Sequence, residues 1–440
     1  MAADATWPGT AGPGEVQRLM AGYRGRALSL SEHLAVHGRL PATGAPTIVG
    51  AVRRAGLIGR GGARFPTAVK LESVAAGGGQ RVVVVNGAEG EPVSAKDQAL
   101  MASVPHLVLD GAAVAAQAVG AHRVIVAARA PADSVIIRAV EERRSFGLDG
   151  VVPEVVTTPN RFLAGEESAL VNFLSGGPLL PRFVPPRPYQ RGVGGRPTLV
   201  SNVETVAHMA LIARWGPEWF RQVGSPSEPG TTLITAGGAV ARPGVYEVAR
   251  GVRVSEAVEV AGGVTTSVAV LLVGGYAGTW VPAASAWDRP LSEEGLAPAG
   301  GVLGAGVVMA LPEQACGVAE TARILRYLAA ENAGQCGPCI HGLDAIAGVL
   351  EELAAGRARR DAVDRLRNWS WQVAGRGACH HPDGAVRLLN SALKVFATDL
   401  SAHRRGQPCP YARNASSLTT PTPPGGGLAG AGSRRGGRRK

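Results

Sequence analysis

Residues Gly56–Lys70 read Gly-Leu-Ile-Gly-Arg-Gly-Gly-Ala-Arg-Phe-Pro-Thr-Ala-Val-Lys. Four glycines within seven residues, followed by Pro66 at a suitable first helical position, predict a tight backbone turn that opens a helix. Bare amides at a helix N-terminus, with Arg60 and Lys70 nearby, attract an anion such as a phosphate. The glycine spacing lacks the third glycine of the dinucleotide-binding fingerprint, so a plain surface turn is an equally open interpretation of these residues alone.

The chain beyond this loop alternates between strand and helix patterns. This order is typical of a parallel sheet with crossover helices, whose ligands bind at the carboxyl ends of the strands. The Pro/Gly-rich segment 178–205 is expected to wrap over that edge. The strands are predicted at 81–85, 123–128 and 152–157, and the helices at 66–77, 107–119 and 132–146.

The pattern of predicted strands and helices changes near residue 228. Strand patterns at 231–236, 244–248 and 268–273, with a helix at 254–261, predict a compact β-β-α-β unit. From about 315 the apolar residues recur with a helical period, which predicts a four-helix bundle. We therefore expect a leader at 1–45 with a short helix near 14–23, a ligand-binding α/β domain at 46–227, the β-β-α-β domain at 228–312, the bundle at 313–403 and a disordered basic tail at 404–440.

Composition narrows the classes of function. Lys and Arg number 45 against 34 Asp and Glu, but five of the positive charges fall within 434–440. Aromatic residues make up only 5% and are not interleaved with basic ones, which argues against a nucleic-acid partner. We expect no secretory signal and no membrane insertion, because the most apolar long stretch, 107–130, is interrupted by charged residues. Five clustered cysteines indicate a reducing compartment, and hence the cytoplasm.

Three polar clusters are candidates for ligand binding. The strand at 81–85 leads into Asn86, Glu89 and Glu91, whose side chains can accept hydrogen bonds from ribose hydroxyls and ring N–H groups. Glu166 and Glu167 follow Gly165, and the segment 201–205 reads Ser-Asn-Val-Glu-Thr. Taken singly, the acidic pair is also explained as favourable charge in the first turn of a helix. The segment 201–205 is explained equally well as a helix cap.

Together the clusters resemble the NADH-binding flavoprotein subunit of respiratory complex I and its relatives in soluble hydrogenases and formate dehydrogenases. The resemblance spans about residues 45 to 400. It implies a Rossmann-like FMN-binding domain, a ubiquitin-like β-grasp domain of the SLBB type and a C-terminal four-helix bundle with an iron–sulfur site. The motifs that carry it are Gly59–Thr67, Asn86–Pro92, Gly165–Leu170, Pro197–Thr205 and Gly334–Cys339.

The resemblance also implies how the site works. Hydride passes directly from the nicotinamide to the flavin, so no side chain acts as a general acid or base, and the protein supplies orientation and electrostatics. The glycine loop and Lys70 would hold the FMN phosphate and ring edge, Phe65 would stack, and Glu91 would face the nicotinamide. The implied cofactor-binding residues are Gly59, Arg60, Gly61, Gly62, Ala63, Phe65, Lys70, Asn86, Glu89, Glu91, Gly165, Glu166, Glu167, Asn202 and Thr205.

Several positions depart from the family pattern. The segment after the first strand has one acid fewer, because it reads Asn86-Gly87-Ala88-Glu89. Phe162 stands where a tyrosine is usual, Ser201 replaces an asparagine, and Arg187 replaces an aromatic residue. FMN binding is compatible with these changes, whereas the choice between NADH and NADPH stays open.

The cysteines differ from the family pattern more than these residues do. The family carries Cys-x2-Cys-x2-Cys and a fourth cysteine about 40 residues further on, and the four thiolates hold a [4Fe-4S] cluster. Here Ala333 occupies the first position, which leaves Cys336, Cys339 and Cys379.

The fourth ligand of such a cluster is left open by the sequence. Cys409 is the candidate, with Cys316, His380, water or a partner's group as alternatives, although Cys316 is expected to be a small buried residue. A chain that has lost its cluster, and a zinc site completed by His380 or His381, are two further interpretations.

The function implied is that of an NAD(P)H dehydrogenase-type flavoprotein. Electrons would pass from NADH to FMN and through the [4Fe-4S] cluster to a ferredoxin or thioredoxin-fold [2Fe-2S] partner, in a larger redox complex or a small reductase. Two alternatives stay open. One is a non-catalytic binding or assembly module that keeps the fold, and the other is a flavin-only reductase.

Overall fold

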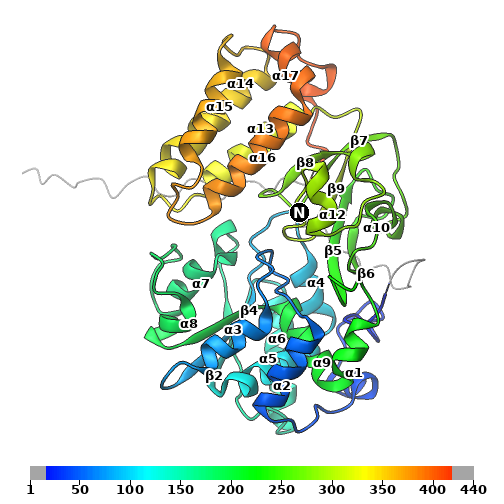
Figure 1. Cartoon of the computed structure of the whole chain (residues 1–440), viewed down its shortest axis with the longest axis vertical. Coiled ribbons are helices and arrows are strands. Elements are labelled where there is room, and N and C mark those ends of the chain that lie inside the picture. Colours follow the sequence, from blue (N-terminus) through cyan, green and yellow to red (C-terminus); the bar gives the residue numbers. More distant parts are fainter. Residues whose placement is uncertain (1–15, 419–440) are drawn as a thin grey trace, which may run out of the picture.

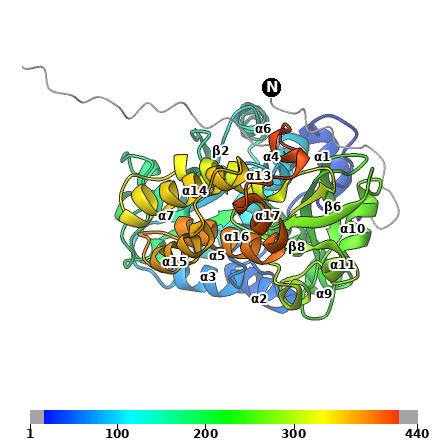
Figure 2. The ribbon, with the colours of Figure 1, turned by 90° about the horizontal axis from the view of Figure 1, so that it is seen from above.

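The computed structural model describes residues 16–418, so the first part of the leader and most of the basic tail, including 434–440, lie outside the described residues. Two sheet-containing units and a helical bundle make up the chain (Figure 1). The bundle occupies one end of the long axis, and α7 of the N-terminal unit lies next to it in both views (Figures 1 and 2).

The N-terminal unit is built on a parallel four-stranded sheet of order β3-β2-β1-β4. The three predicted strands are confirmed, with slightly different ends. The fourth was not predicted, because its residues lie within the Pro/Gly-rich segment expected to wrap over the site. Four of its five residues are nevertheless buried against β1. The strands are β1 Arg81–Gly87, β2 Ala121–Ala128, β3 Glu154–Thr157 and β4 Thr198–Asn202.

Helices cover this sheet, and α5 and α9 pack most closely. A Cβ on Gly111 of α5 would lie 2.1 Å from the carbonyl oxygen of Val206 in α9, so only glycine permits this approach. The predicted helices at 66–77, 107–119 and 132–146 are confirmed. α9 begins where the segment 201–205 was interpreted as a helix cap, because Asn202 is its N-cap and accepts the backbone N–H of Glu204 at 3.0 Å. The helices are α2 Ala45–Ala55, α3 Thr67–Ala75, α4 Lys96–Ser103, α5 Pro105–Val119, α6 Ala132–Ser145, α7 Glu167–Leu174, α8 Pro188–Arg191 and α9 Val203–Arg221.

The leader differs from its prediction. Residues 16–23 form turns rather than a helix, because the backbone N–H groups of Arg18, Leu19 and Met20 donate to the buried carboxylate of Glu247. The helix of this region is α1 (Leu30–His37), which opens with a reciprocal capping box.

The second unit is a mixed five-stranded sheet of order β6-β5-β9-β7-β8. The predicted β-β-α-β unit is confirmed, and two later strands complete it, with β9 parallel to β5 at the centre. Its elements are β5 Thr231–Gly238, β6 Gly244–Ala249, α10 Val254–Val260, β7 Val268–Val273, β8 Thr279–Pro282, α11 Ala283–Ala286, α12 Glu293–Leu296 and β9 Val307–Pro312.

The predicted bundle is confirmed, and the predicted apolar stripes form its core, including Leu350 and Leu389. A π-helical turn, Pro338–Leu343, leads into α14. Residues 404–418 differ from the disordered tail that was expected: Ser416 donates to Glu320 at 2.7 Å, and Leu418 is only 2% exposed. The helices are α13 Gly317–Ala330, α14 Asp344–Ala354, α15 Ala362–Val373, α16 His381–Val395 and α17 Ala397–Arg404.

Within residues 16–418, no single helix has both the length and the apolar character to span a bilayer. One pair, α4 and α5, satisfies these criteria jointly, but its two members meet at 99°.

Candidate functional site

The glycine loop between α2 and α3 is closed by its own backbone. Gly59 donates its N–H to the carbonyl of Phe65 at 2.9 Å, and the backbone N–H of Arg60 donates to Thr205 Oγ1 at 2.9 Å. Gly62 has φ +98°, a conformation that residues with a Cβ rarely adopt. The loop therefore holds its shape only with glycine at this position.

The start of α3 can receive an anion. Pro66 is the N-cap rather than the first helical residue, and no described side chain caps the helix. The N–H of Thr67 donates to the carbonyl of Leu57 at 3.0 Å. The next two amides, those of Ala68 and Val69, have no partner within the helix and can face a ligand. The hydroxyl of Thr67 is buried and has no hydrogen-bond partner among residues 16–418. A buried hydroxyl without a partner beside free helix amides fits a phosphate-bearing cofactor.

The carboxyl ends of β1 and β4 lie beside the loop. Asn86 and Asn202 are register partners, and Asn202 Nδ2 lies 3.4 Å from the carbonyl oxygen of Asn86. A Cβ on Gly61 would lie 3.3 Å from Cβ of Asn202, so the loop backbone rests directly on the sheet edge. Gly61, Ala63 and Phe65 are exposed on the open side of the loop. We call the glycine loop, the start of α3 and this sheet edge the cradle, because their small residues and backbone amides are groups that suit FMN.

The acidic cluster after Gly165 borders the cradle on the side of α7. Asn86 Nδ2 donates to the carbonyl of Gly165 at 3.2 Å. Lys70 Nζ of α3 donates to Glu167 at 2.7 Å. Glu166 is the N-cap of α7 and accepts from the backbone N–H of Ala169 at 2.7 Å, and Glu167 lies in the first turn, so the interpretation of this pair as charge at a helix start is confirmed. The structure thus brings the glycine loop, Lys70, Asn86, Gly165, Glu167 and Asn202 together.

Two predicted binding residues have side chains committed elsewhere. The guanidinium of Arg60 is 1% exposed and donates to the carbonyl of Thr231 at 3.1 Å, and burial lowers its pKa to about 9. The carboxylate of Glu89 is buried and accepts from the backbone N–H groups of Asp97 and Gln98, both at 3.0 Å, at the start of α4. In the structure, Arg60 joins the first unit to the second, and Glu89 caps a helix.

A buried charge network under the sheet edge was missed by the sequence analysis. Lys96 Nζ lies 2.6 Å from Asp97 and 2.9 Å from Glu204, and its distance to Asn202 Oδ1 is 3.4 Å. Burial alone would raise the pKa of Glu204, but Lys96 and Arg60 hold it well below its usual range. The network fixes the orientation of the Asn202 amide. Adjacent residues of opposite charge usually lie on a protein surface. The sequence at 96–97 therefore did not indicate a buried network.

Glu91 links the first unit to the second. Its carboxylate accepts the backbone N–H of Tyr276 at 3.0 Å in the loop between β7 and β8. A Cβ on Gly275 would lie 2.4 Å from Cδ of Glu91, so this loop needs glycine to approach. Burial raises the pKa of Glu91 to about 7, although three backbone N–H groups oppose the shift.

We expect the Glu91→Gln variant to be more stable than the wild type at pH 8 and equally stable at pH 4.5. The raised pKa means that folded Glu91 keeps its proton from pH 4.5 to about 7 while the unfolded chain has lost it, so the stability from this group falls as pH rises through that window. The difference is roughly 1 to 3 kcal/mol at pH 8. Thermal unfolding of both proteins at several pH values checks it, and a constant difference across pH contradicts it.

The cysteines that match the cluster motif lie at one end of the bundle. Cys339 is buried in the π-helical turn, and its backbone N–H donates to the carbonyl of Cys336 at 3.2 Å. Burial raises the pKa of Cys339, and the neighbouring thiols of Cys336 and Cys379 raise it further. The three thiols therefore share one neighbourhood, while Ala333 offers no ligand atom.

The chemistry of these residues fits an iron–sulfur cluster. Three cysteine thiols gathered at one end of the bundle are the ligand type of a [4Fe-4S] cluster, with one thiolate for each of three irons. Ala333 leaves the fourth iron without a cysteine from this motif.

The structure does not place Cys409 near the other three cysteines of the proposed cluster. It lies beside Cys316 and His403, and His403 Nδ1 bonds the carbonyl of Leu353 at 3.0 Å near the last turn of α14. Cys339 precedes the first turn of the same helix. At 1.5 Å per residue, the fourteen residues from Cys339 to Leu353 span roughly 20 Å.

The loop before α7 connects the cradle to the cysteines. On one side, its Gly165 carbonyl accepts from Asn86 at 3.2 Å. On its other side, the ring of Phe162 lies 5.0 Å from that of His381, two residues after Cys379. The Phe162 N–H also donates to the buried Glu331 at the end of α13 at 2.9 Å. One short loop therefore contacts both the cradle and the cluster end of the bundle.

Comparison with known protein families agrees with this division of the chain. Residues 52–211 match the Nuo51 FMN-binding domain, residues 233–275 match the SLBB domain, and residues 319–403 match the NADH-ubiquinone oxidoreductase-F iron-sulfur binding region. The first match contains the glycine loop and both asparagines, and the last contains Cys336, Cys339 and Cys379.

Individual relatives are similar to this chain over most of its length. The chain is 33% identical over 389 residues to the NADH-quinone oxidoreductase F subunit of Mycobacterium tuberculosis, covering 83% of this chain and 86% of that protein. It is 32% identical over 372 residues to the corresponding F subunit of Escherichia coli, covering 81% and 84%. A solved NAD+-reducing [NiFe]-hydrogenase chain superposes with a TM-score of 0.77 at 32% identity.

That superposition covers 82% of this chain and 63% of the hydrogenase chain, so this protein spans less than two thirds of that neighbour. The two bacterial oxidoreductase relatives are covered over 86% and 84% of their own lengths. The glycine loop, the paired asparagines and the cysteine turn all lie inside the matched regions. The chain belongs to the family of NADH-quinone oxidoreductase F subunits, with its Nuo51 FMN-binding domain, SLBB domain and iron–sulfur binding region.

Proposed function

We propose that this chain takes electrons from NADH and delivers them, one at a time, to a ferredoxin-type protein. The observation that carries the proposal is the loop 162–167, which contacts Asn86 of the cradle on one side and the cluster end of the bundle on the other. Bound FMN supplies the chemistry that the side chains lack, because it accepts two electrons as a hydride and can release them singly.

The residues of the cradle bind and orient. Backbone amides at the start of α3, with the Thr67 hydroxyl and Lys70, are the groups for the FMN phosphate. Asn86 and Asn202 lie at the sheet edge and shape it. The amide of Asn202 is held by Asp97 at 2.7 Å and by the backbone N–H of Glu204 at 3.0 Å. Glu167 shares the ammonium group of Lys70 and is available for a ribose hydroxyl. The guanidinium of Arg60 and the carboxylate of Glu89 support the fold around the site.

Cys336, Cys339 and Cys379 would hold the cluster on three thiolates. Cys339 is buried, and Cys336 and Cys379 are half-buried. Glu166 lies close enough to Cys379 to raise the pKa of that thiol, after the larger effect of burial. We assign the FMN/NADH domain to 46–227, the β-grasp domain to 228–312 and the iron–sulfur bundle to 313–403.

The proposed electron acceptor is a one-electron carrier, and the proposed location of the protein is the cytoplasm. A one-electron carrier with a [2Fe-2S] cluster, in a ferredoxin or a thioredoxin fold, is the acceptor that a terminal cluster suits. The relatives are named as subunits, which supports assembly into a larger redox complex. All five cysteines are free thiols, as expected for a cytoplasmic protein.

Anaerobic titration of the purified protein tests the proposal. Addition of NADH is expected to bleach the flavin absorbance at about one NADH per FMN, and added [2Fe-2S] ferredoxin then becomes reduced. The same titration with NADPH determines the donor. A colourless protein, or a flavin that neither nucleotide reduces, would contradict the proposal and favour a binding module that has kept only the fold.

A further inference from the structure

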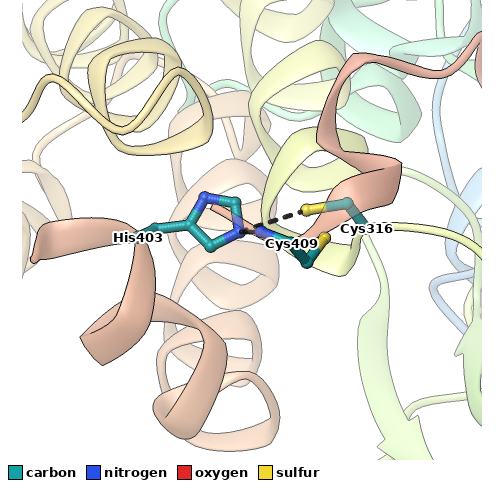
Figure 3. A group of neighbouring side chains, drawn as sticks. All are labelled: Cys316, His403 and Cys409. Atoms are coloured by element: carbon teal, nitrogen blue, oxygen red, sulfur yellow. Dashed lines mark hydrogen bonds between the residues drawn. The ribbon is translucent and has the colours of Figure 1, made fainter. Parts of the chain in front are cut away.

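A second group of metal-type side chains lies at the far end of the bundle. Cys316, His403 and Cys409 come together there, and their ligand atoms all lie within 4.8 Å of one another (Figure 3). Cys316 and His403 are buried, and Cys409 is half-buried. Both cysteines fall outside the matched iron–sulfur region at 319–403.

The imidazole of His403 is oriented and protonated as a metal ligand would be. Its Nδ1 bonds the backbone carbonyl of Leu353 at 3.0 Å, and because a carbonyl only accepts, Nδ1 carries the proton. Nε2 is then an unprotonated acceptor that faces the other two residues, as Figure 3 shows. Metal-bound histidines usually donate their second ring N–H to a carbonyl or carboxylate in this way.

The distances suit a tetrahedral ion. Nε2 of His403 lies 3.6 Å from Sγ of Cys316. With Zn–S near 2.3 Å and Zn–N near 2.0 Å, two ligand atoms of a tetrahedral zinc lie about 3.5 Å apart. Sγ of Cys316 also accepts the N–H of Ala319 at 3.4 Å at the start of α13.

We propose that Cys316, His403 and Cys409 bind a zinc ion, with water as the fourth ligand on the exposed side of Cys409. Soft thiolates with one imidazole in a tetrahedral arrangement select zinc over harder cations. Each thiol releases a proton when it binds the ion. The backbone N–H of Cys409, which now lies 3.2 Å from Nε2, gives up that contact to the metal.

The ion would join segments that are far apart in the sequence. Cys316 is the N-cap of α13, His403 lies in the last turn of α17, and Cys409 precedes the short turn at Pro410–Arg413. It would close the bundle at the end opposite the iron–sulfur cysteines and hold residues 404–418 against α13. A structural ion of this kind stabilises the folded state directly.

Metal analysis of the full chain, purified anaerobically without chelator, tests the assignment. We expect about one zinc per chain. The Cys409→Ser variant should bind zinc at least about tenfold more weakly and keep its iron. The matched control, Cys336→Ser, should lose iron and keep zinc. Cobalt(II) added to the zinc-depleted wild type should give the visible absorption of thiolate-bound tetrahedral cobalt, and Cys409→Ser should not.

Three results would overturn the proposal: a wild-type chain without zinc or a cobalt spectrum, loss of zinc from both variants alike, or a Cys316–Cys409 disulfide found by mass and thiol counting in place of zinc. Because iron and FMN are quantified in the same samples, failure of the zinc site is distinguishable from failure of the proposed electron transfer.

Discussion

Replacing Gly62 with valine is expected to remove FMN from the purified protein while leaving the fold intact. Gly62 has φ +98°, so a β-branched residue forces the loop into another backbone conformation. Such strain costs about 1 to 3 kcal/mol, and each 1.4 kcal/mol lowers affinity about tenfold. A Cβ here would lie 3.6 Å from the carbonyl of Gly304, an ordinary contact, so the surrounding core need not move.

Gly79→Val is the matched control for this variant. Gly79 has φ +75°, and nothing lies within 4 Å of the position that a Cβ would take there, so valine imposes similar strain in a loop away from the cradle. The control is expected to lose some stability and keep its flavin. The readouts are FMN per chain by absorbance after denaturation, and circular dichroism for the fold. Full FMN content in Gly62→Val would refute the placement of the site.

Replacing Cys379 with serine is expected to abolish iron binding and spare the flavin. With only three thiolates available, loss of one leaves Cys336 and Cys339, which is too few to hold a cubane. NADH should still bleach the flavin in this variant, whereas reduction of a ferredoxin should fall at least about 100-fold because the cluster is gone. Iron, sulfide and FMN analysis together with the ferredoxin assay measure these effects.

Cys409→Ser serves as the comparison for this variant. Cys409 lies beside Cys316 and His403 at the far end of α14, so its loss should leave the iron content unchanged. Iron loss in Cys409→Ser would mean instead that Cys409 completes the cluster. Unchanged iron in Cys379→Ser would contradict the location of the cluster itself.

The sequence predicted most of what local patterns determine. The apolar stripes of the bundle were readable because burial on one face leaves a periodic signal. β1 was readable as a continuous run of valines, because both of its faces are buried. The loop before α3 was readable from its glycines. The motif residues Asn86, Gly165 and Asn202 do meet at the sheet edge. Carboxyl ends of parallel strands converge there by topology alone.

What the sequence could not predict depends on long-range contacts. Arg60 sits in the glycine loop, yet its guanidinium is buried against the second unit through Thr231, 171 residues away. β4 is a short strand within Pro/Gly-rich chain and is defined only by its pairing with β1. Cys316 and Cys409 are far apart in sequence, and only the folded bundle brings them to His403.

Anaerobic purification, with iron, sulfide and FMN quantified and electron paramagnetic resonance spectra recorded before and after NADH, tests the central claim most directly. The account predicts about one FMN and about four irons per chain, and a cluster signal that develops when NADH is added. Flavin without iron, or a cluster that stays silent while NADH bleaches the flavin, would contradict electron passage from the cradle to the cysteine turn.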